Sequence, residues 1–408
     1  MNWTGVAVFA VTYVLISARR LSWLGFDRPA GALFGAVACV ALGVLSPERA
    51  LQSIHGPTLL LLFGVMGMGA CLALDGFFDV LESAIVRCAR TPARLLASIV
   101  WGAGLLSAFL TNDAVCVLAA PIVVRLVRRH GLPPLPYLLG LATAANTGSV
   151  GTLVGNPQNM LCASLGGLSY RDHLVVAFPL ALVCLAANHA ILHVFYRQQL
   201  ACTSLGAEAP RRRLGVNARI TLGVIVATAV AYTLGADLAW SATTGLVALM
   251  LLHRRDTTEL WSRIDWSLLI FFSGLFVVVE GLVRSGATTA LFSYYPLFGH
   301  GSAGFSDWLR TAVVFLVGSN AVSNVPFILV VRDQMAASPD TVLGWEVLAM
   351  ASTFAGNLTL LGSAANIIVA ESARPIGGIG FFEHLKVGLP VALVTTLIGV
   401  VWLYAFFH

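Results

Sequence analysis

Apolar segments follow one another along almost the whole chain, yet many are shorter than the about 20 residues that a transmembrane helix needs. In two places a polar turn joins a pair of short segments: S-A-F-L-T-N-D at 107–113 and S-N-A-V-S-N-V at 319–325. We expect each pair to form a re-entrant hairpin, at about 94–129 and about 308–331, with the polar turn at its tip.

Basic residues support the first hairpin. Arg87, Arg90 and Arg94 precede it and Arg129 follows it, so both of its ends face the cytoplasm if positive loops do. When each following segment is placed from this starting point, both termini lie outside and a linker at 201–217 lies inside. Nineteen of the 24 Lys and Arg residues then lie on the cytoplasmic side. Non-helical backbone at membrane depth is tolerated only where protein or a wet cavity covers it. We therefore expect both tips to lie inside the protein.

Two longer apolar segments are interrupted. The sequence G-N-P at 155–157 breaks the segment 135–165, because proline lacks the backbone N–H and glycine permits unusual dihedral angles. The segment 342–370 is interrupted by G-N at 356–357 and G-S at 362–363. A helix that restarts exposes N–H groups and a partial positive charge, which suit an anion, while free carbonyl groups suit Na⁺.

The two halves of the chain repeat one another at offsets between 207 and 212 residues. Because they start on opposite sides of the membrane, the repeat is inverted. We expect an all-α polytopic membrane protein with an inverted repeat of about five spans in each half, the first at 1–200 and the second at 218–408, each half with one hairpin and one broken helix. The aligned pairs are 58–64 with 268–274, 107–112 with 319–324, and 152–159 with 359–366.

Composition narrows the class. Of the 408 residues, 58% are hydrophobic and 11% charged, whereas soluble domains carry about 25% charged residues. The mean hydropathy of +0.86 leaves no room for a soluble domain. The net charge of +5 comes from loops and reports topology, not nucleic-acid binding. The seven cysteines form no C-x-x-C pair and the nine histidines show no ligand spacing, so we expect no disulfide and no resident metal centre.

Inverted repeats build many secondary transporters, in which solute and coupling ion bind near mid-membrane at broken helices. The motifs that would do so here resemble the ion transporter superfamily, which includes divalent-anion:sodium symporters, arsenite efflux permeases, citrate-transporter-like permeases and some sodium/proton antiporters. They are TNDAVCVLAAP at 111–121, NTGSVGTLVGNPQN at 146–159, SNAVSNVP at 319–326 and STFAGNLTLLGSAAN at 352–366.

This resemblance covers nearly the whole chain. It implies a scaffold domain, a moving transport domain, a homodimer and an elevator mechanism. It also implies that the tips and the breaks hold the solute and the coupling cation. The residues that match are Ser107, Thr111, Asn112, Gly155, Asn156 and Asn159 in the first half and Ser319, Asn320, Ser323, Asn324, Gly362, Ser363 and Asn366 in the second.

The tips depart from the divalent-anion symporters, which carry Ser-Asn-Thr at both. Here the first tip reads T-N-D at 111–113 and the second S-N-V at 323–325. The acidic residue resembles the arsenite-permease and citrate-transporter-like branches. Val325 lacks a hydroxyl that a dicarboxylate would use, which disfavours a dicarboxylate solute.

Asp113 is the strongest single candidate. A carboxylate at mid-membrane costs about 3 kcal/mol on insertion scales. No basic residue within the tip neutralises it, so Na⁺ or H⁺ is its natural partner. The alternative is a helix N-cap, a role that Asp fills well. Glu280, in contrast, is explained by an ion pair with Arg284 at i+4. For a Na⁺ ion the candidate ligands are Thr111, Asn112, Asp113 and Asn156.

We expect a secondary active transporter of a small anion or oxyacid, driven by Na⁺ or H⁺, in lipid of the inner (plasma) membrane and without a cofactor. Two alternatives stay open within transport: an arsenite efflux permease, which would take an ATPase subunit as partner, and a sodium/proton antiporter. A membrane-embedded enzyme would need a nucleophile–base pair or a metal cluster, and the sequence lacks both.

The topology predicts that the two hairpins enter from opposite faces. Cysteine-accessibility labelling should therefore place the residues 107–113 and 319–325 within the bilayer, reached from different sides. Labelling that found both tips on one face, or outside the lipid, would contradict it.

Overall fold

The computed structural model describes residues 2–17, 27–201, 212–298 and 304–408. Within these ranges the chain forms helices and no strand, which confirms the all-α fold. Most of the predicted linker at 201–217 lies outside the described residues, as do Arg19, Arg20 and Arg211.

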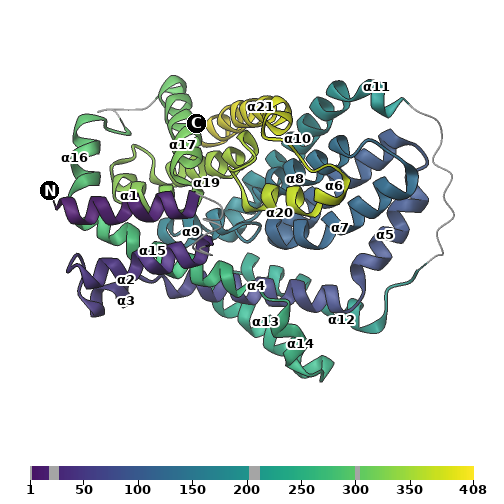
Figure 1. Cartoon of the computed structure of the whole chain (residues 1–408), viewed down its shortest axis with the longest axis horizontal. Helices are drawn as coiled ribbons and strands as arrows, with labels where there is room; N and C mark the ends of the chain where they lie inside the picture. The colour runs from purple at the N-terminus through teal and green to yellow at the C-terminus, as the bar shows by residue number, and fades with distance from the viewer. Residues whose placement is uncertain (1, 18–26, 202–211, 299–303) are drawn as a thin grey trace.

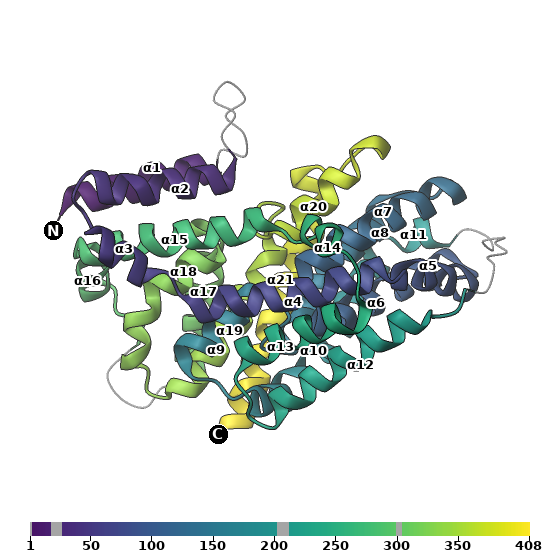
Figure 2. The same cartoon turned by 90° about the horizontal axis from the view of Figure 1, so that it is seen from below.

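The helices form two layers. In Figure 1 the lower layer contains the first helices of each half, and Figure 2 shows α4 running along the molecule within it. We call this layer the scaffold. Its helices are α1 (Trp3–Ser17), α2 (Arg28–Ala41), α3 (Pro47–Ser53), α4 (Gly56–Leu74), α12 (Val216–Thr233), α13 (Leu238–His253), α14 (Thr257–Ser262) and α15 (Trp266–Arg284).

The upper layer of Figure 1 holds both hairpins and both broken helices, and we call it the transport layer. Its first-half helices are α5 (Phe77–Cys88), α6 (Pro92–Phe109), α7 (Asn112–His130), α8 (Leu135–Ser149), α9 (Pro157–Gly166), α10 (Tyr170–Phe195) and α11 (Arg197–Leu200). Its second-half helices are α16 (Ala287–Tyr294), α17 (Phe305–Val322), α18 (Asn324–Val331), η1 (Arg332–Ala337), α19 (Thr341–Leu358), α20 (Ala364–Ser372), η2 (Arg374–Ile376) and α21 (Phe381–Phe407).

Within the scaffold, each helix pair takes one helix from each half of the chain. Helix α4 packs along α13, and α15 packs along α2. At each crossing a glycine meets an alanine: a Cβ on Gly64 would lie 2.7 Å from Ala242, and one on Gly274 would lie 2.7 Å from Ala32. The two glycines are 210 positions apart in the sequence, and so are the two alanines. Because small residues let helix backbones approach closely in a membrane, these two crossings explain why T-L-L-L-L-F-G at 58–64 recurs as L-L-I-F-F-S-G.

A fourth repeated segment escaped the sequence analysis. The start of α10, Y-R-D-H-L-V-V-A-F-P-L-A-L-V at 170–183, matches the start of α21, F-F-E-H-L-K-V-G-L-P-V-A-L-V at 381–394. It aligns His173 with His384 and Pro179 with Pro390 at an offset of 211. The inverted repeat therefore continues beyond the breaks to the last helix of each half.

One predicted break is wrong. The segment 342–370 is interrupted only at 359–363, between α19 and α20, whereas Gly356 and Asn357 are both helical. The Asn357 side chain bonds across the halves, to Thr147 and Asn146, so its polarity serves contact with a neighbouring helix and not a change of backbone direction. The first break lies where it was expected, at 150–156 between α8 and α9.

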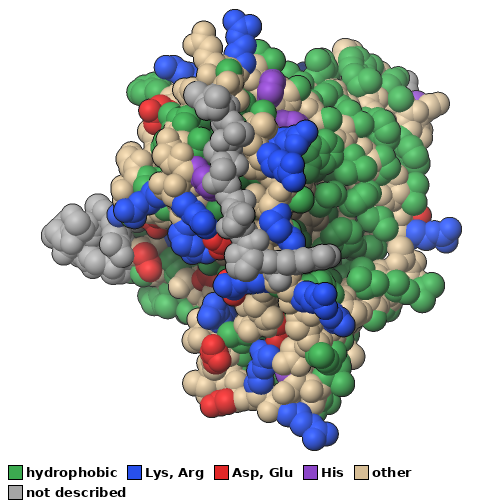
Figure 3. Space-filling model, turned by 90° about the vertical axis from the view of Figure 1, so that its right-hand side faces the viewer, with side chains coloured by type: hydrophobic (Ala, Val, Ile, Leu, Met, Phe, Trp, Pro, Cys, Tyr) green, Lys and Arg blue, Asp and Glu red, His purple; other side chains and the backbone are tan. Residues whose placement is uncertain are grey.

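In the described part of the chain, six helices are long and apolar enough to cross a membrane: α4, α6, α10, α12, α15 and α21. Figure 3 shows Lys and Arg side chains gathered over the end of the molecule that carries α5 and α11. This clustering fits the charge asymmetry of the sequence. The side of the membrane that this end faces, and the exact boundaries of the two repeats, stay predictions.

Glycine also sets the spacing within the transport layer. A Cβ on Gly148 of α8 would lie 2.1 Å from the Gly104 carbonyl oxygen of α6, whereas a Cβ on Gly102 would meet nothing within 4 Å. We predict that Gly148→Ala forces α6 and α8 apart and destabilises the protein by about 3 kcal/mol or more, as overpacking does. Gly102→Ala, on α6 two residues before Gly104, should leave the thermal unfolding temperature in detergent unchanged. Equal unfolding temperatures for the two variants would contradict this close approach.

Candidate solute and ion site

A small cavity of about 60 Å³ lies where the transport layer meets the scaffold. Four helices present their first residues to it: α7, α9, α18 and α20. Both hairpin tips and both breaks therefore converge on one point, as expected of the two halves. Its polar lining consists of Arg28, Asn112, Asp113, Gln158, Ser323, Asn324 and Ser363, and its apolar wall includes Leu268, Phe271 and Phe272 of α15.

Four buried oxygen atoms that belong to lining residues have no hydrogen-bond partner among the described residues. They are Asn112 Oδ1, Asp113 Oδ1, Gln158 Oε1 and Asn324 Oδ1. An unpaired buried polar atom costs about 1–3 kcal/mol, so a cluster of them needs an explanation. All four are acceptors. A ligand that satisfies them brings hydrogen-bond donors or a positive charge.

The electrostatics of the cavity are mixed. Four helix N-termini contribute partial positive charge, and Arg28 adds a full charge. Asp113 opposes them with its carboxyl group, which lines the cavity beside the first turn of α20. The cavity is thus built for a small polar species and is not a site of strong single charge.

Asn146 of α8 connects the two halves at this point. Its Oδ1 accepts from Asn112 Nδ2 at 2.9 Å and from Ser363 Oγ at 3.0 Å. Its Nδ2 donates to Asn357 Oδ1 and Asn366 Oδ1, both at 3.1 Å. One fully buried amide therefore joins the first tip to the second break.

The two breaks are closed by one device used twice. Asn159 Nδ2 donates to the carbonyl oxygens of Ser149 and Thr152, and Asn366 Nδ2 donates to those of Gly356 and Thr359. Every residue of the second set lies 207 positions after its counterpart. These asparagines satisfy carbonyl groups that the interrupted helices α8 and α19 leave free.

The other end of each asparagine reaches the opposite half. Asn159 Oδ1 accepts from Thr353 Oγ1 at 3.1 Å, just as Asn366 Oδ1 accepts from Asn146. Thr353 is the counterpart of Asn146 at the same offset. It also accepts from Asn156 Nδ2 at 3.1 Å. Each break is thus held by a polar residue from the helix across the pseudo-symmetry axis.

Each tip is fastened to the break of its own half. The Asn112 backbone N–H donates to the Gly155 carbonyl at 3.0 Å, and Thr359 Oγ1 donates to Asn320 Oδ1 at 2.8 Å. Gly155 is required there, because a Cβ would lie 2.3 Å from the Ser149 carbonyl oxygen. A movement of either tip therefore disturbs the adjacent break.

The second tip carries backbone strain. Ser323, between α17 and α18, has φ +70° and ψ 150°, a region that is essentially restricted to glycine and costs of the order of 1–3 kcal/mol for other residues. The matching Thr111 has an ordinary extended backbone, φ −66° and ψ 141°, and caps α7. The two tips therefore differ in conformation although their sequences repeat.

The predicted site residues fall into two groups. Asn112, Asp113, Ser323, Asn324, Gly362 and Ser363 line the cavity. The others do not: Ser107, Gly155, Asn156, Asn159, Ser319, Asn320 and Asn366 stand in the tips and breaks behind it, and Thr111 faces a neighbouring vestibule. Of the four candidate Na⁺ ligands, the cavity brings together only Asn112 and Asp113. A role in binding stays a prediction for every one of these residues.

Two vestibules approach the site from opposite ends of α4. The first, of about 680 Å³, is lined by the start of α4, by Tyr170 to Asp172 and by Tyr232 to Ala239. The second, of about 350 Å³, is lined by the end of α4, by Thr111, Asp113 and by Ser262 to Asp265. Asp113 lines both the second vestibule and the small cavity.

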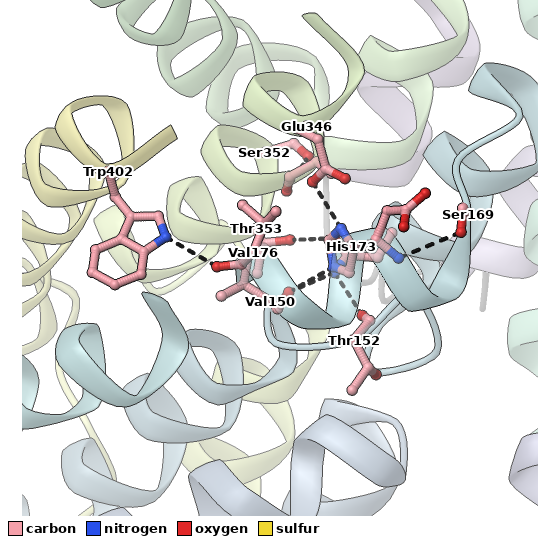
Figure 4. A network of polar contacts seen from close by, with 12 residues as sticks. Val150, Thr152, Ser169, His173, Val176, Glu346, Ser352, Thr353 and Trp402 are labelled. Carbon is pink, nitrogen blue, oxygen red and sulfur yellow. Dashed lines mark hydrogen bonds and ion pairs between the residues drawn. The ribbon is translucent and has the colours of Figure 1, made fainter. Parts of the chain in front are cut away.

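Sequence reasoning missed several polar residues of this region. Asn146, Gln158 and Arg28 belong to the site, and only the spacing of polar residues along α8 could have indicated the first. It also missed a buried contact, shown in Figure 4, in which His173 Nδ1 lies 2.7 Å from Glu346 Oε2. Glu280 lies where expected, with Arg284 at 2.8 Å, and Arg332 joins that pair.

The chain matches the sequence model of the citrate transporter family over residues 13–355. It is 32% identical to the silicon efflux transporter LSI3 of Oryza sativa subsp. japonica, over 97% of this chain and 96% of the relative. It is 23% identical to a putative transporter arsB of Dictyostelium discoideum, over 96% and 90%. The crystal structure of the Alcanivorax borkumensis YdaH transporter shares the fold, with a TM-score of 0.58, 14% identity and coverage of 99% and 97%.

Removal of the Asn146 side chain should destabilise the protein strongly. Asn146→Ala leaves Asn112 and Ser363 without an acceptor and Asn357 without a donor, at about 1–3 kcal/mol for each buried group. Asn324→Ala is the matched control, since Asn324 is a buried amide of the same site whose Oδ1 has no partner. Thermal unfolding in detergent should show a large loss for the first variant and a small one for the second. Similar losses would mean that Asn146 does not join the halves.

Proposed function

Because the chain belongs to the citrate transporter family, whose members are membrane transporters and not enzymes, we propose that it is a secondary active transporter of a small oxyacid, coupled to Na⁺ or H⁺. The observation that carries this proposal is the small cavity with four unpaired acceptor oxygens. Its volume and its hydrogen-bonding character both bear on the solute.

Volume favours a small solute. A cavity of about 60 Å³ has room for a small solute or a few water molecules. Citrate, with three carboxylate groups on a branched carbon chain, would require the site to expand. A mononuclear oxyacid or a dehydrated cation fits with little rearrangement.

Hydrogen bonding favours the same class. A carboxylate offers only acceptors, which would face the unpaired oxygens of Asn112, Gln158 and Asn324. The hydroxyl groups of an undissociated oxyacid are donors. The rice relative is named for silicon efflux, and dissolved silicon at neutral pH is the oxyacid Si(OH)₄. Arsenite, As(OH)₃, has the same donor chemistry, so arsenite efflux with an ATPase partner is a special case of this proposal.

The two layers suggest how the solute would move. In an elevator the transport layer, which holds the tips and breaks, slides against the scaffold formed by the α2–α15 and α4–α13 pairs. Asp113 would carry the coupling cation, because it lines both the cavity and the second vestibule. We further propose a homodimer in the inner (plasma) membrane, with the basic end of Figure 3 in the cytoplasm.

Transport into proteoliposomes tests the proposal. With a panel of silicic acid, arsenite, citrate, succinate and sulfate, we expect flux of at least one of the first two and none of citrate or succinate. Flux of citrate alone would contradict the oxyacid assignment. Na⁺/H⁺ exchange with no flux of any solute would instead favour an antiporter.

Replacement of Asp113 separates binding from coupling. Asp113→Asn keeps the volume and one acceptor oxygen but cannot neutralise a cation, so net flux driven by a Na⁺ or H⁺ gradient should fall at least tenfold. Asp79→Asn is the control, because Asp79 is an exposed carboxylate on α5. If Asp113→Asn transports as well as the wild type, the carboxylate has no part in coupling.

A further inference from the structure

The contact between His173 and Glu346 binds one proton. Both side chains are buried, with relative exposures of 1% and 4%. His173 Nε2 lies 3.0 Å from the Val150 carbonyl oxygen, and since a carbonyl has no proton to give, Nε2 carries the hydrogen. The contact of 2.7 Å between Nδ1 and Glu346 Oε2 then holds a single proton, whichever atom carries it. Histidine, carboxylate and this proton are together neutral.

In the part of the chain that the structure describes, no further charged group forms an ion pair with His173 or Glu346. Helices α8, α9 and α18 contain no charged residue, and α19 contains only Glu346. On α10, Arg171 and Asp172 are exposed, and the titratable groups around the pair are Cys162, Tyr170 and, against Tyr170, Tyr232. The other ionisable residues of the packed elements lie within about two turns of an element's end: Arg94, His189, His193, Arg219, Asp307, Arg310, Arg332, Asp333, Glu383, His384 and Lys386. Loss of the proton would therefore leave a buried carboxylate facing an imidazole lone pair, which is costly.

The pair is connected to the first break. The Val150 carbonyl, the first beyond α8, accepts both from His173 Nε2 and from Asn159 Nδ2, the latter at 3.3 Å. Glu346 and Thr353 lie seven residues apart on one face of α19, and both hold this break, the first through His173 and the second through Asn159 (Figure 4). The break ends at α9, whose first residues line the small cavity between the transport layer and the scaffold.

The first vestibule reaches the residues next to His173 in sequence. The first vestibule is lined by Ser169, Tyr170, Arg171 and Asp172, the four residues that immediately precede His173. When the break opens, the imidazole and the carboxylate lose the contact that shared the proton and become accessible from this vestibule.

The other half supplies a natural control. His384 occupies the position of His173 in α21, is fully buried, and has no partner at either ring nitrogen. The position that corresponds to Glu346 is Leu139 of α8, at the offset of 207. The histidine is thus repeated, but of the two only His173 of the first half meets a carboxylate, that of Glu346 in the second half, with which to share a proton.

We propose that His173 and Glu346 form a proton-binding site, and that opening of the first break releases its proton to the water of the first vestibule. This inference rests on the proposed function for one consequence, which is that the released proton acts as a coupling ion during transport. The site itself is independent of the solute.

Hydrogen–deuterium exchange of the detergent-solubilised chain tests this proposal without a solute. Above about pH 7.5 a solvated imidazole is neutral and a solvated carboxyl is ionised, so the open break holds no proton. The opening constant of segment 150–156, obtained after division by the intrinsic exchange rate, should then rise about tenfold per pH unit between about pH 7.5 and 9, as linkage to one proton requires. The segment 357–363 should show no such slope.

Glu346→Gln distinguishes a proton site from a structural contact. Its amide can donate to Nδ1 while Nε2 still donates to Val150, so the contact is kept but no proton can leave. The slope at 150–156 should disappear in this variant. A slope that persists in Glu346→Gln, a flat wild type, or equal slopes in both segments would overturn the proposal. Failure of every solute in the proteoliposome panel would instead count against the proposed function, because the exchange experiment contains no solute.

Discussion

Buried amide groups that must bond to one another hold the centre of this molecule together. At the depth of the breaks the backbone of α8 and α19 stops being helical, and its free carbonyls have no water to bond with. Asn159 and Asn366 take up these carbonyls, and Asn146 and Thr353 orient those asparagines from across the pseudo-symmetry axis. If one member is lost, its partners become unpaired in an apolar interior. The breaks, and the cavity at their ends, exist because this network is complete.

The network is symmetric where it supports structure and asymmetric where it meets the cavity. The glycine–alanine crossings of the scaffold and the asparagine–carbonyl bonds of the breaks recur at constant offsets. In contrast, Asp113 is matched by Val325 at the tips, and Glu346 is matched by Leu139 in the broken helices. Both carboxylates therefore depart from a repeat that is otherwise apolar at these positions. Because an ionisable group within the membrane is costly, both carboxylates are candidates for a functional role.

The sequence was informative where polarity interrupts an apolar segment. The tips at 107–113 and 319–325 and the break at 155–157 are visible because glycine, proline and asparagine stand out there, and the all-α inverted repeat follows from them. Asn146 and Glu346 were missed because each lies within a continuous helix, where a single polar residue carries no sign of what it will face. Gly356-Asn357 was misread for the converse reason, since the same residue types serve contact between helices. Which polar residues meet at the cavity depends on how four helices converge, and no local pattern encodes that.

The unusual backbone of Ser323 distinguishes the two arms of the site. A non-glycine residue with a backbone φ of +70° stores conformational energy that Thr111, with its extended backbone, does not. Any rearrangement that lets Ser323 return to a common conformation recovers that energy, whereas movement of the first arm must break the cap on α7 and gain nothing in exchange. The tip that contains Ser323 therefore stores conformational energy in the observed arrangement, and the contacts around it must offset that energy.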